Sequence, residues 1–167
     1  AVSHPPACAF AFSPDSKQIL TCDEENIVRT WNVLTGEQVA DLKGCKGRVI
    51  KFVFSPQGDA AAALAMDEGI FVWDLKSTKL VTNINTSVSD NSLGDLSFSP
   101  DGQKLVTAGH DRSARVWDIR SGRLLAELLG HRNQVEQCAF GPAGDRVITQ
   151  SIARGQVNEN GLVVDPS

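Results

Sequence analysis

The sequence repeats one short phrase four times, and the spacing inside the repeat is constant. The phrase FSPDS, FSPQG, FSPDG or FGPAG begins at Phe12, Phe54, Phe98 and Phe140, which are 42, 44 and 42 residues apart. A tryptophan follows the first three of these residues 19 positions later, and the three are Trp31, Trp73 and Trp117. Two landmarks that keep their separation belong to one repeating unit. A period of about 40–45 residues is typical of β-propellers or of helical arrays.

The alternation of side chains within the unit favours strands. An apolar stretch leads to each Phe, and the residue two positions earlier can face a core: Phe10, Phe52, Leu96 and Cys138. This period of two predicts a strand. The Pro and Gly of the phrase predict a tight turn, after which come a second strand, an acidic turn, a third strand ending at the Trp and a fourth strand. Each unit is therefore predicted to be a four-stranded antiparallel meander, with units at 1–43, 44–85, 86–129 and 130–167.

The fourth unit departs from the pattern. Glu159 stands where the Trp is due. Asn160-Gly161 is a strong two-residue turn signal, and it predicts a lengthened hairpin followed by a third strand over 162–165. Val164 would then replace the Trp, and we expect this unit to lack its outer strand.

Composition restricts the function classes. Of 167 residues, 41% are hydrophobic and 22% are charged, which is typical of a packed globular chain. The net charge of −4 argues against a nucleic-acid or anionic-membrane binder. No apolar run approaches 18 residues, so we expect a soluble, cytoplasmic or otherwise intracellular chain. The cysteines (Cys8, Cys22, Cys45 and Cys138) form no C-x-x-C pair, which predicts free thiols and no zinc site.

At this point the sequence resembles the WD40 repeat family of β-propellers over nearly its whole length. The residues that carry the resemblance are Trp73-Asp74, Trp117-Asp118, Gly130-His131 and the four recurring turns. It implies an all-β propeller with four antiparallel blades, the fourth incomplete, in a ring of about seven or eight blades. The chain would then be part of a longer ring. Assembly of two chains and a closed four-blade monomer are the alternatives.

The family often buries a hydrogen-bonded set in each blade, made of His, Ser or Thr, Asp and Trp. The resemblance assigns these structural roles to Thr21, Glu25 and Trp31 in the first unit, to Asp67 and Trp73 in the second, to Thr107, Asp111 and Trp117 in the third, and to His131 and Thr149 in the fourth. No unit has all four members. Ala63 and Cys45 replace two of them in the second unit, and Ser89 replaces the His in the third.

The resemblance implies a non-catalytic scaffold that presents the loops between blades to other proteins, in a cytoskeletal, ciliary or regulatory complex. The expected location is cytoplasmic, and a cytoskeletal or nuclear location is the alternative. The candidate protein-interaction residues on these loops are Glu24, Arg48, Ile50, Met66, His110, Gln134 and Glu136. Arg48, Ile50 and Met66 are the candidate anchor patch, because Arg and Met are enriched at interfaces. The expected partners are other proteins, the remaining blades or a second copy of the chain. The alternative is the sensor or regulatory propeller of a larger multidomain protein, for example an NTPase, with its chemistry elsewhere.

An enzyme is not expected. His110-Asp111 beside Thr107 could act as a base and its orienting group, but the G-x-S-x-G nucleophile motif is absent from the sequence. The sequence also has no P-loop and no dinucleotide fingerprint. We therefore expect no catalytic residue, no cofactor and no metal.

Overall fold

The computed structural model describes residues 9–86 and 93–151, and within them every regular element is a β-strand. The strands form four antiparallel sheets, each in sequence order from strand to strand. The first sheet contains β1 (Phe10–Phe12), β2 (Gln18–Cys22), β3 (Val28–Asn32) and β4 (Gln38–Leu42). The second contains β5 (Val49–Phe54), β6 (Ala60–Ala65), β7 (Gly69–Asp74) and β8 (Lys79–Ile84). The third contains β9 (Leu93–Phe98), β10 (Lys104–Gly109), β11 (Ala114–Asp118) and β12 (Leu124–Leu128), and the fourth contains β13 (Val135–Phe140) and β14 (Val147–Ser151).

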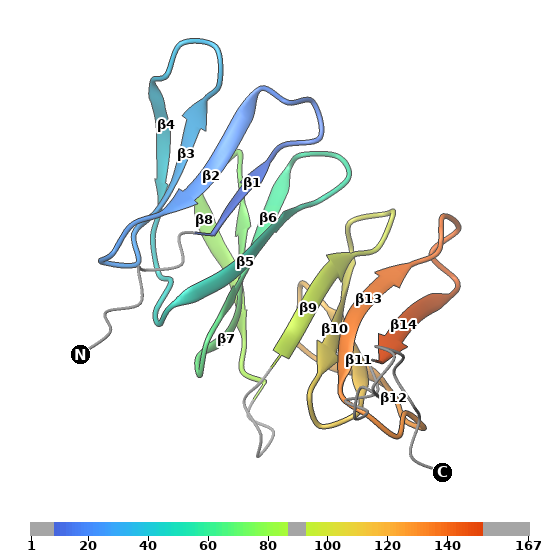
Figure 1. Cartoon of the computed structure of the whole chain (residues 1–167). Helices are drawn as coiled ribbons and strands as arrows, with labels where there is room; N and C mark the ends of the chain where they lie inside the picture. The colour runs from blue at the N-terminus through green and yellow to red at the C-terminus, as the bar shows by residue number, and fades with distance from the viewer. Residues whose placement is uncertain (1–8, 87–92, 152–167) are drawn as a thin grey trace, which may run out of the picture.

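The sheets stand side by side in an open arc, with the first and fourth at its two ends (Figure 1). The first strand of each sheet lies next to the first strand of the next, so that β1, β5, β9 and β13 are successive neighbours. The expected all-β fold of propeller-type antiparallel blades is confirmed. The turn at Asn160-Gly161, the strand at 162–165, Cys8 and Ser89 lie outside the described residues.

The repeated phrase forms the turn between the first and second strands of each sheet. In the second sheet, Ser55 N–H donates to Ala60 O at 2.9 Å, and Gly58 N–H donates to Ser55 O at 2.8 Å. Gly58 has φ of +72°, in the left-handed region that favours glycine. The Ser55 hydroxyl also donates to Asp59 Oδ1 at 2.8 Å. The phrase therefore forms the tight turn that the sequence predicts, and the hydrogen bond between Ser55 and Asp59 stabilises it.

The two residues of the Trp-Asp pair have different structural roles, one in the core and one in a turn. Trp73 is fully buried, whereas Asp74 caps the turn between β7 and β8. Asp74 Oδ1 accepts hydrogen bonds from the backbone N–H and the hydroxyl of Ser77, at 2.6 and 2.7 Å. Asp118 makes the same two bonds with Ser121. These bonds lower the pKa of both carboxyl groups below the ordinary value for aspartate.

The core consists of layers between sheets, and each layer joins two unlike faces. The Trp-bearing face of the second sheet, with Phe52 and Trp73, packs on Leu20 and Val28 of the first sheet. In the same way Leu96, Phe98 and Trp117 of the third sheet pack on Ala62, Ile70 and Val72 of the second. The fourth sheet follows the rule with Val135 and Cys138 against Val106 and Val116.

The first sheet shows what happens to the Trp-bearing face when no described sheet covers it. Phe10 is 65% exposed and Phe12 is 54% exposed, whereas Phe52 is only 4% exposed at the place equivalent to Phe10. Trp31 is half-buried for the same reason. Phe10 thus lies on the predicted strand, but it is not part of a core within the described structure. The strand pattern was read correctly, but the burial of this face depends on a neighbouring sheet.

Candidate functional site

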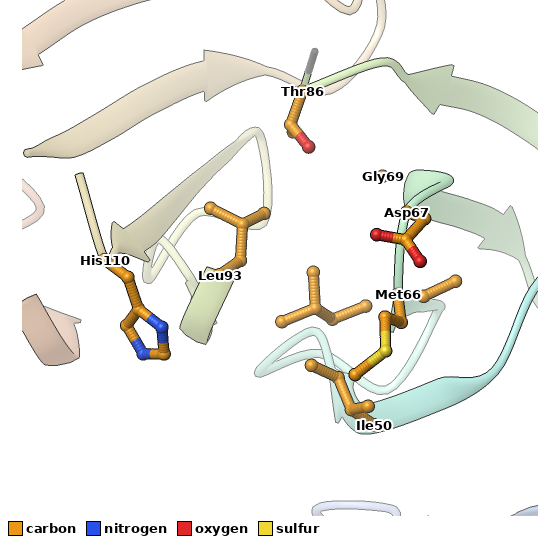
Figure 2. A pocket seen from close by; sticks show the side chains of 9 residues that line it. Ile50, Met66, Asp67, Gly69, Thr86, Leu93 and His110 are labelled. Carbon is orange, nitrogen blue, oxygen red and sulfur yellow. The ribbon is translucent and has the colours of Figure 1, made fainter. Parts of the chain in front are cut away.

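A pocket of about 320 Å³ opens between the second and third sheets, and Figure 2 shows it from close by. Its apolar wall comes from both sheets, because Ile50 and Met66 belong to the second and Leu93 to the third. Met66 is 44% exposed and Ile50 is 36% exposed. Asp67, Thr86 and His110 add polar groups around the same space. Three candidate interaction residues, Ile50, Met66 and His110, are thus brought together in one site.

The turn after the second strand positions Met66 and Asp67. Met66 N–H donates to Arg48 O at 2.8 Å, which holds the start of this turn against the start of β5. Asp67 has φ of +63°, a left-handed conformation that Asp and Asn adopt more readily than most residues. As a result its carboxylate points into the same space as the side chains of Met66 and Leu93 (Figure 2).

The corresponding acid in the third sheet is neutralised by its own sheet. Asp111 Oδ2 accepts from Arg115 Nη2 at 2.6 Å, and Asp111 Oδ1 accepts from the Ser113 hydroxyl at 2.7 Å. Arg115 also pairs with Glu127 on the fourth strand at 2.7 Å. Burial alone would raise the pKa of Asp111, but the bonds from Arg115 and Ser113 outweigh burial and lower it.

The first sheet reaches the same arrangement with its acid at another position. Asp23, not the expected Glu25, binds Arg29, with Oδ2 and Nη1 2.5 Å apart. Asp23 Oδ1 also accepts the N–H of Ile27 at 2.9 Å, and this bond is the main cause that lowers the Asp23 pKa. Asp23 occupies the turn position that Gly109 holds in the third sheet. A Cβ on Gly109 would lie 2.4 Å from Asp111 Oδ1, so the glycine makes room for an acid two residues later.

The second sheet has no such pair. Phe71 replaces the arginine of the other two sheets two residues before the Trp, and it stacks on Trp73 with ring centroids 6.2 Å apart. Gly69 stands where Ser113 stands in the third sheet. Among the described residues, the Asp67 carboxylate has no hydrogen-bond or ion-pair partner. It is therefore the turn acid whose charge is left uncompensated at the pocket.

His110 forms the far side of the pocket. Its Nε2 atom lies 3.4 Å from Glu136 Oε2 on β13, too long for a good hydrogen bond. Within the described structure, His110 Nε2 and Gln134 Oε1 are buried and have no hydrogen-bond partner. Glu136 and Gln134 thus lie on the fourth-sheet side of His110 and do not line the pocket itself. Arg48 and Glu24 are exposed, and neither lines the pocket.

The structural residues assigned from the sequence form separate pairs. Trp31 and Trp117 donate through Nε1 to Thr21 and Thr107 at 2.8 and 3.0 Å. Trp73, which faces Ala63 in place of a hydroxyl, donates to Lys43 O at 2.8 Å. In the fourth sheet, His131 Nε2 lies 2.7 Å from Thr149 Oγ1, and its Nδ1 lies 3.0 Å from Ser151 Oγ.

One feature that the sequence analysis missed joins three sheets. Lys51 on β5 forms an ion pair with Asp95 on β9. Asp95 Oδ2 also accepts the backbone N–H of Cys138 on β13 at 3.0 Å. Lys51 and Asp95 both stand three residues before the repeated Phe. Opposite charges at one repeat position in consecutive units were the signal that could have revealed the pair.

Within residues 9–86 and 93–151, no cluster of three or more His, Cys, Asp or Glu side chains is arranged to hold a metal ion. No helix in the same part of the chain is long and apolar enough to cross a membrane.

Comparison with known protein families identifies the repeat. The family model described as "WD domain, G-beta repeat" matches residues 2–32 and 79–118. The chain therefore matches the WD40 repeat in two segments. The two matched segments end at Asn32 and Asp118, one residue after Trp31 and Trp117.

Two curated relatives share part of this WD40 region. A WD repeat-containing protein 26 homolog of Arabidopsis thaliana is 36% identical over 74 residues, which is 43% of this chain and 12% of the relative. Pre-mRNA-processing factor 19 of Oryza sativa subsp. japonica is 34% identical over 80 residues, which is 48% of this chain and 15% of the relative. The matches therefore span a small fraction of the length of these relatives. WD40 repeats generally mediate protein–protein interactions and are typically non-catalytic.

Proposed function

We propose that this chain is a non-catalytic docking segment that binds another protein at the pocket between its second and third sheets. The observation that carries the proposal is the convergence of Ile50, Met66 and Leu93 from two consecutive sheets on one partly exposed apolar hollow. Interfaces concentrate their binding energy in a few anchor side chains that enter such pockets. A volume of about 320 Å³ suits one anchor of that kind.

The flanking residues fit a protein partner. Exposed Met66 can adapt its unbranched side chain to different anchors. Arg48 is exposed, and its backbone carbonyl accepts the N–H of Met66, so an exposed cation lies on the segment next to the pocket. The name of the first relative identifies a WD repeat-containing protein, and the name of the second identifies a pre-mRNA-processing factor. The name of the second relative therefore favours the nuclear setting, which we propose beside the cytoplasmic one.

The test is a binding measurement on surface variants. Random peptides are selected on the full chain, and the affinities of the recovered peptides are measured by fluorescence polarisation. Ile50→Glu and Met66→Glu should each weaken binding at least tenfold, because a carboxylate enters the apolar wall. The matched control is Leu34→Glu, since Leu34 is 89% exposed in a turn of the first sheet. Unchanged binding by both pocket variants, with circular dichroism showing intact folding, would contradict the proposal.

A further inference from the structure

We propose that the occupant of this pocket is a lysine or arginine side chain of the protein partner. Its aliphatic part would lie along Ile50, Leu93 and Met66, and its charged end would meet the Asp67 carboxylate. The inference rests on the proposed docking function and names the chemistry that the docked segment must have.

The first argument is the internal comparison between sheets. In the first and third sheets the turn acid is matched by an arginine of the same sheet, Arg29 or Arg115. Each arginine also meets a second acid on the fourth strand, Asp41 at 3.2 Å or Glu127 at 2.7 Å. The second sheet keeps the acid, Asp67, but carries Phe71 in place of the arginine. A cation supplied from outside would restore the interaction that the other two sheets make internally.

The second argument is the shape and polarity of the pocket. Its walls are mainly aliphatic and come from Leu64, Ala65, Ile50, Leu93 and Met66. Figure 2 shows the side chains of Ile50, Met66 and Leu93 around the same space as the Asp67 carboxylate. Lysine and arginine bury their methylene stems on such surfaces while their charged ends seek a polar partner. Asp67 supplies that partner at the wall, and Thr86 adds a hydroxyl to the same lining.

The charges around the pocket also favour a cation. Asp67 is the carboxylate of the lining, whereas Glu68, which follows it, does not line the pocket. On the opposite side, His110 lies next to Glu136. Arg48 is the opposing charge, but it does not line the pocket. An anionic anchor would meet Asp67 directly, and a purely apolar anchor would leave the carboxylate without a partner in a less hydrated site.

The test uses four nine-residue peptide libraries that differ only at a fixed central residue, which is Arg, Lys, norleucine or Glu. Each library is titrated against the full chain and against Asp67→Asn. Asn tolerates the left-handed conformation of residue 67, so the variant removes charge without backbone strain. Glu68→Gln is the matched control, because it removes a neighbouring exposed charge that does not line the pocket.

We expect the Arg and Lys libraries to bind the unaltered chain best and to lose roughly threefold to tenfold in affinity with Asp67→Asn. The loss should shrink in 0.5 M salt, because screening weakens partly exposed charge pairs. Glu68→Gln should change the affinities less than twofold. Equal binding of the norleucine library to the unaltered chain and to Asp67→Asn, with no advantage for Arg or Lys, would overturn this inference and leave protein docking intact. If Ile50→Glu also left all binding unchanged, the docking function itself would fail.

Discussion

Lys51 and Asp95 form an ion pair that joins the inner strands of the second and third sheets. Asp95 is the better enclosed partner, because 13% of its side chain is exposed, compared with 40% for Lys51. The second carboxylate oxygen extends the connection to the Cys138 N–H of the fourth sheet. One acidic side chain therefore couples three consecutive sheets.

Asp95→Ala should lower the free energy of unfolding by about 2–3 kcal/mol, because it leaves the buried Cys138 N–H without its acceptor. Lys51→Met should cost only about 1 kcal/mol, since Asp95 keeps two backbone donors. Urea denaturation followed by tryptophan fluorescence measures both values. A larger loss for the lysine variant would show that the ion pair, not the backbone bond, holds the sheets together.

Thr107→Val should destabilise the chain by about 1–3 kcal/mol, because the buried Trp117 Nε1–H loses its acceptor. Thr21→Val is the matched control. Trp31 is only half-buried, so water can replace the lost hydroxyl there and the cost should stay below about 1 kcal/mol. Thermal melts of the two variants decide the matter, and equal losses would argue against the role of burial.

Gly69→Ala should cost about 3 kcal/mol or more. Its φ is +94°, and an added Cβ would lie 2.3 Å from Ile84 O. Gly36→Ala separates strain from collision, because Gly36 has φ of +71° and no atom within 4 Å of an added Cβ. That control should lose only about 1–2 kcal/mol. Chemical denaturation measures the free energy of unfolding of both variants. Similar losses would show that the backbone near Ile84 shifts to accommodate the added Cβ.

Stability should fall as the pH drops below about 4. The folded state lowers the pKa of Asp111 below its unfolded value, so the stabilisation is present above the unfolded pKa and is lost as pH falls through the folded pKa. Melting temperatures at pH 6, 4 and 3 measure the loss. Asp111→Asn should show a shallower decline than the unaltered chain, and an equally steep decline would assign the acid sensitivity to other groups.

The described cysteines should react slowly in the native chain. Burial raises the pKa of Cys45 and of Cys138 to about 12, so the reactive thiolate is scarce near neutral pH. Iodoacetamide at pH 7.5 should label these two residues slowly until denaturant is added. Cys45 and Cys138 are free thiols. Mass spectrometry after denaturation without reductant should find four alkylated cysteines, as the sequence predicts. Rapid native labelling of Cys138 would indicate that the third and fourth sheets separate readily.

The period of the sequence was enough to predict the sheets, their turns and the place of each Trp on a third strand. It could not locate the pocket, because Ile50, Met66 and Leu93 meet only when two sheets pack together. The spacing to the Trp assigned the acidic role in the first turn to Glu25, although Asp23 forms the ion pair. The assignment failed because the first and third turns place their acids at different positions. Which turn position holds the acid that pairs with the arginine depends on whether Gly109 or a residue with a side chain precedes it. This effect appears only in three dimensions.

Each sheet has a Trp-bearing face and an aliphatic face, so the two ends of the row of sheets present different surfaces. In the second and third sheets the Trp-bearing face packs on the aliphatic face of the sheet before it, as Trp73 packs on Leu20 and Val28. A two-fold symmetric pairing would bring like faces together, with Phe10 and Phe12 of one copy against those of another. An assembly that repeats the contacts seen here must instead be head-to-tail, which generates rings or open filaments according to the rotation at each step. A homodimer joined through these faces would thus be heterologous, with a different surface used on each copy.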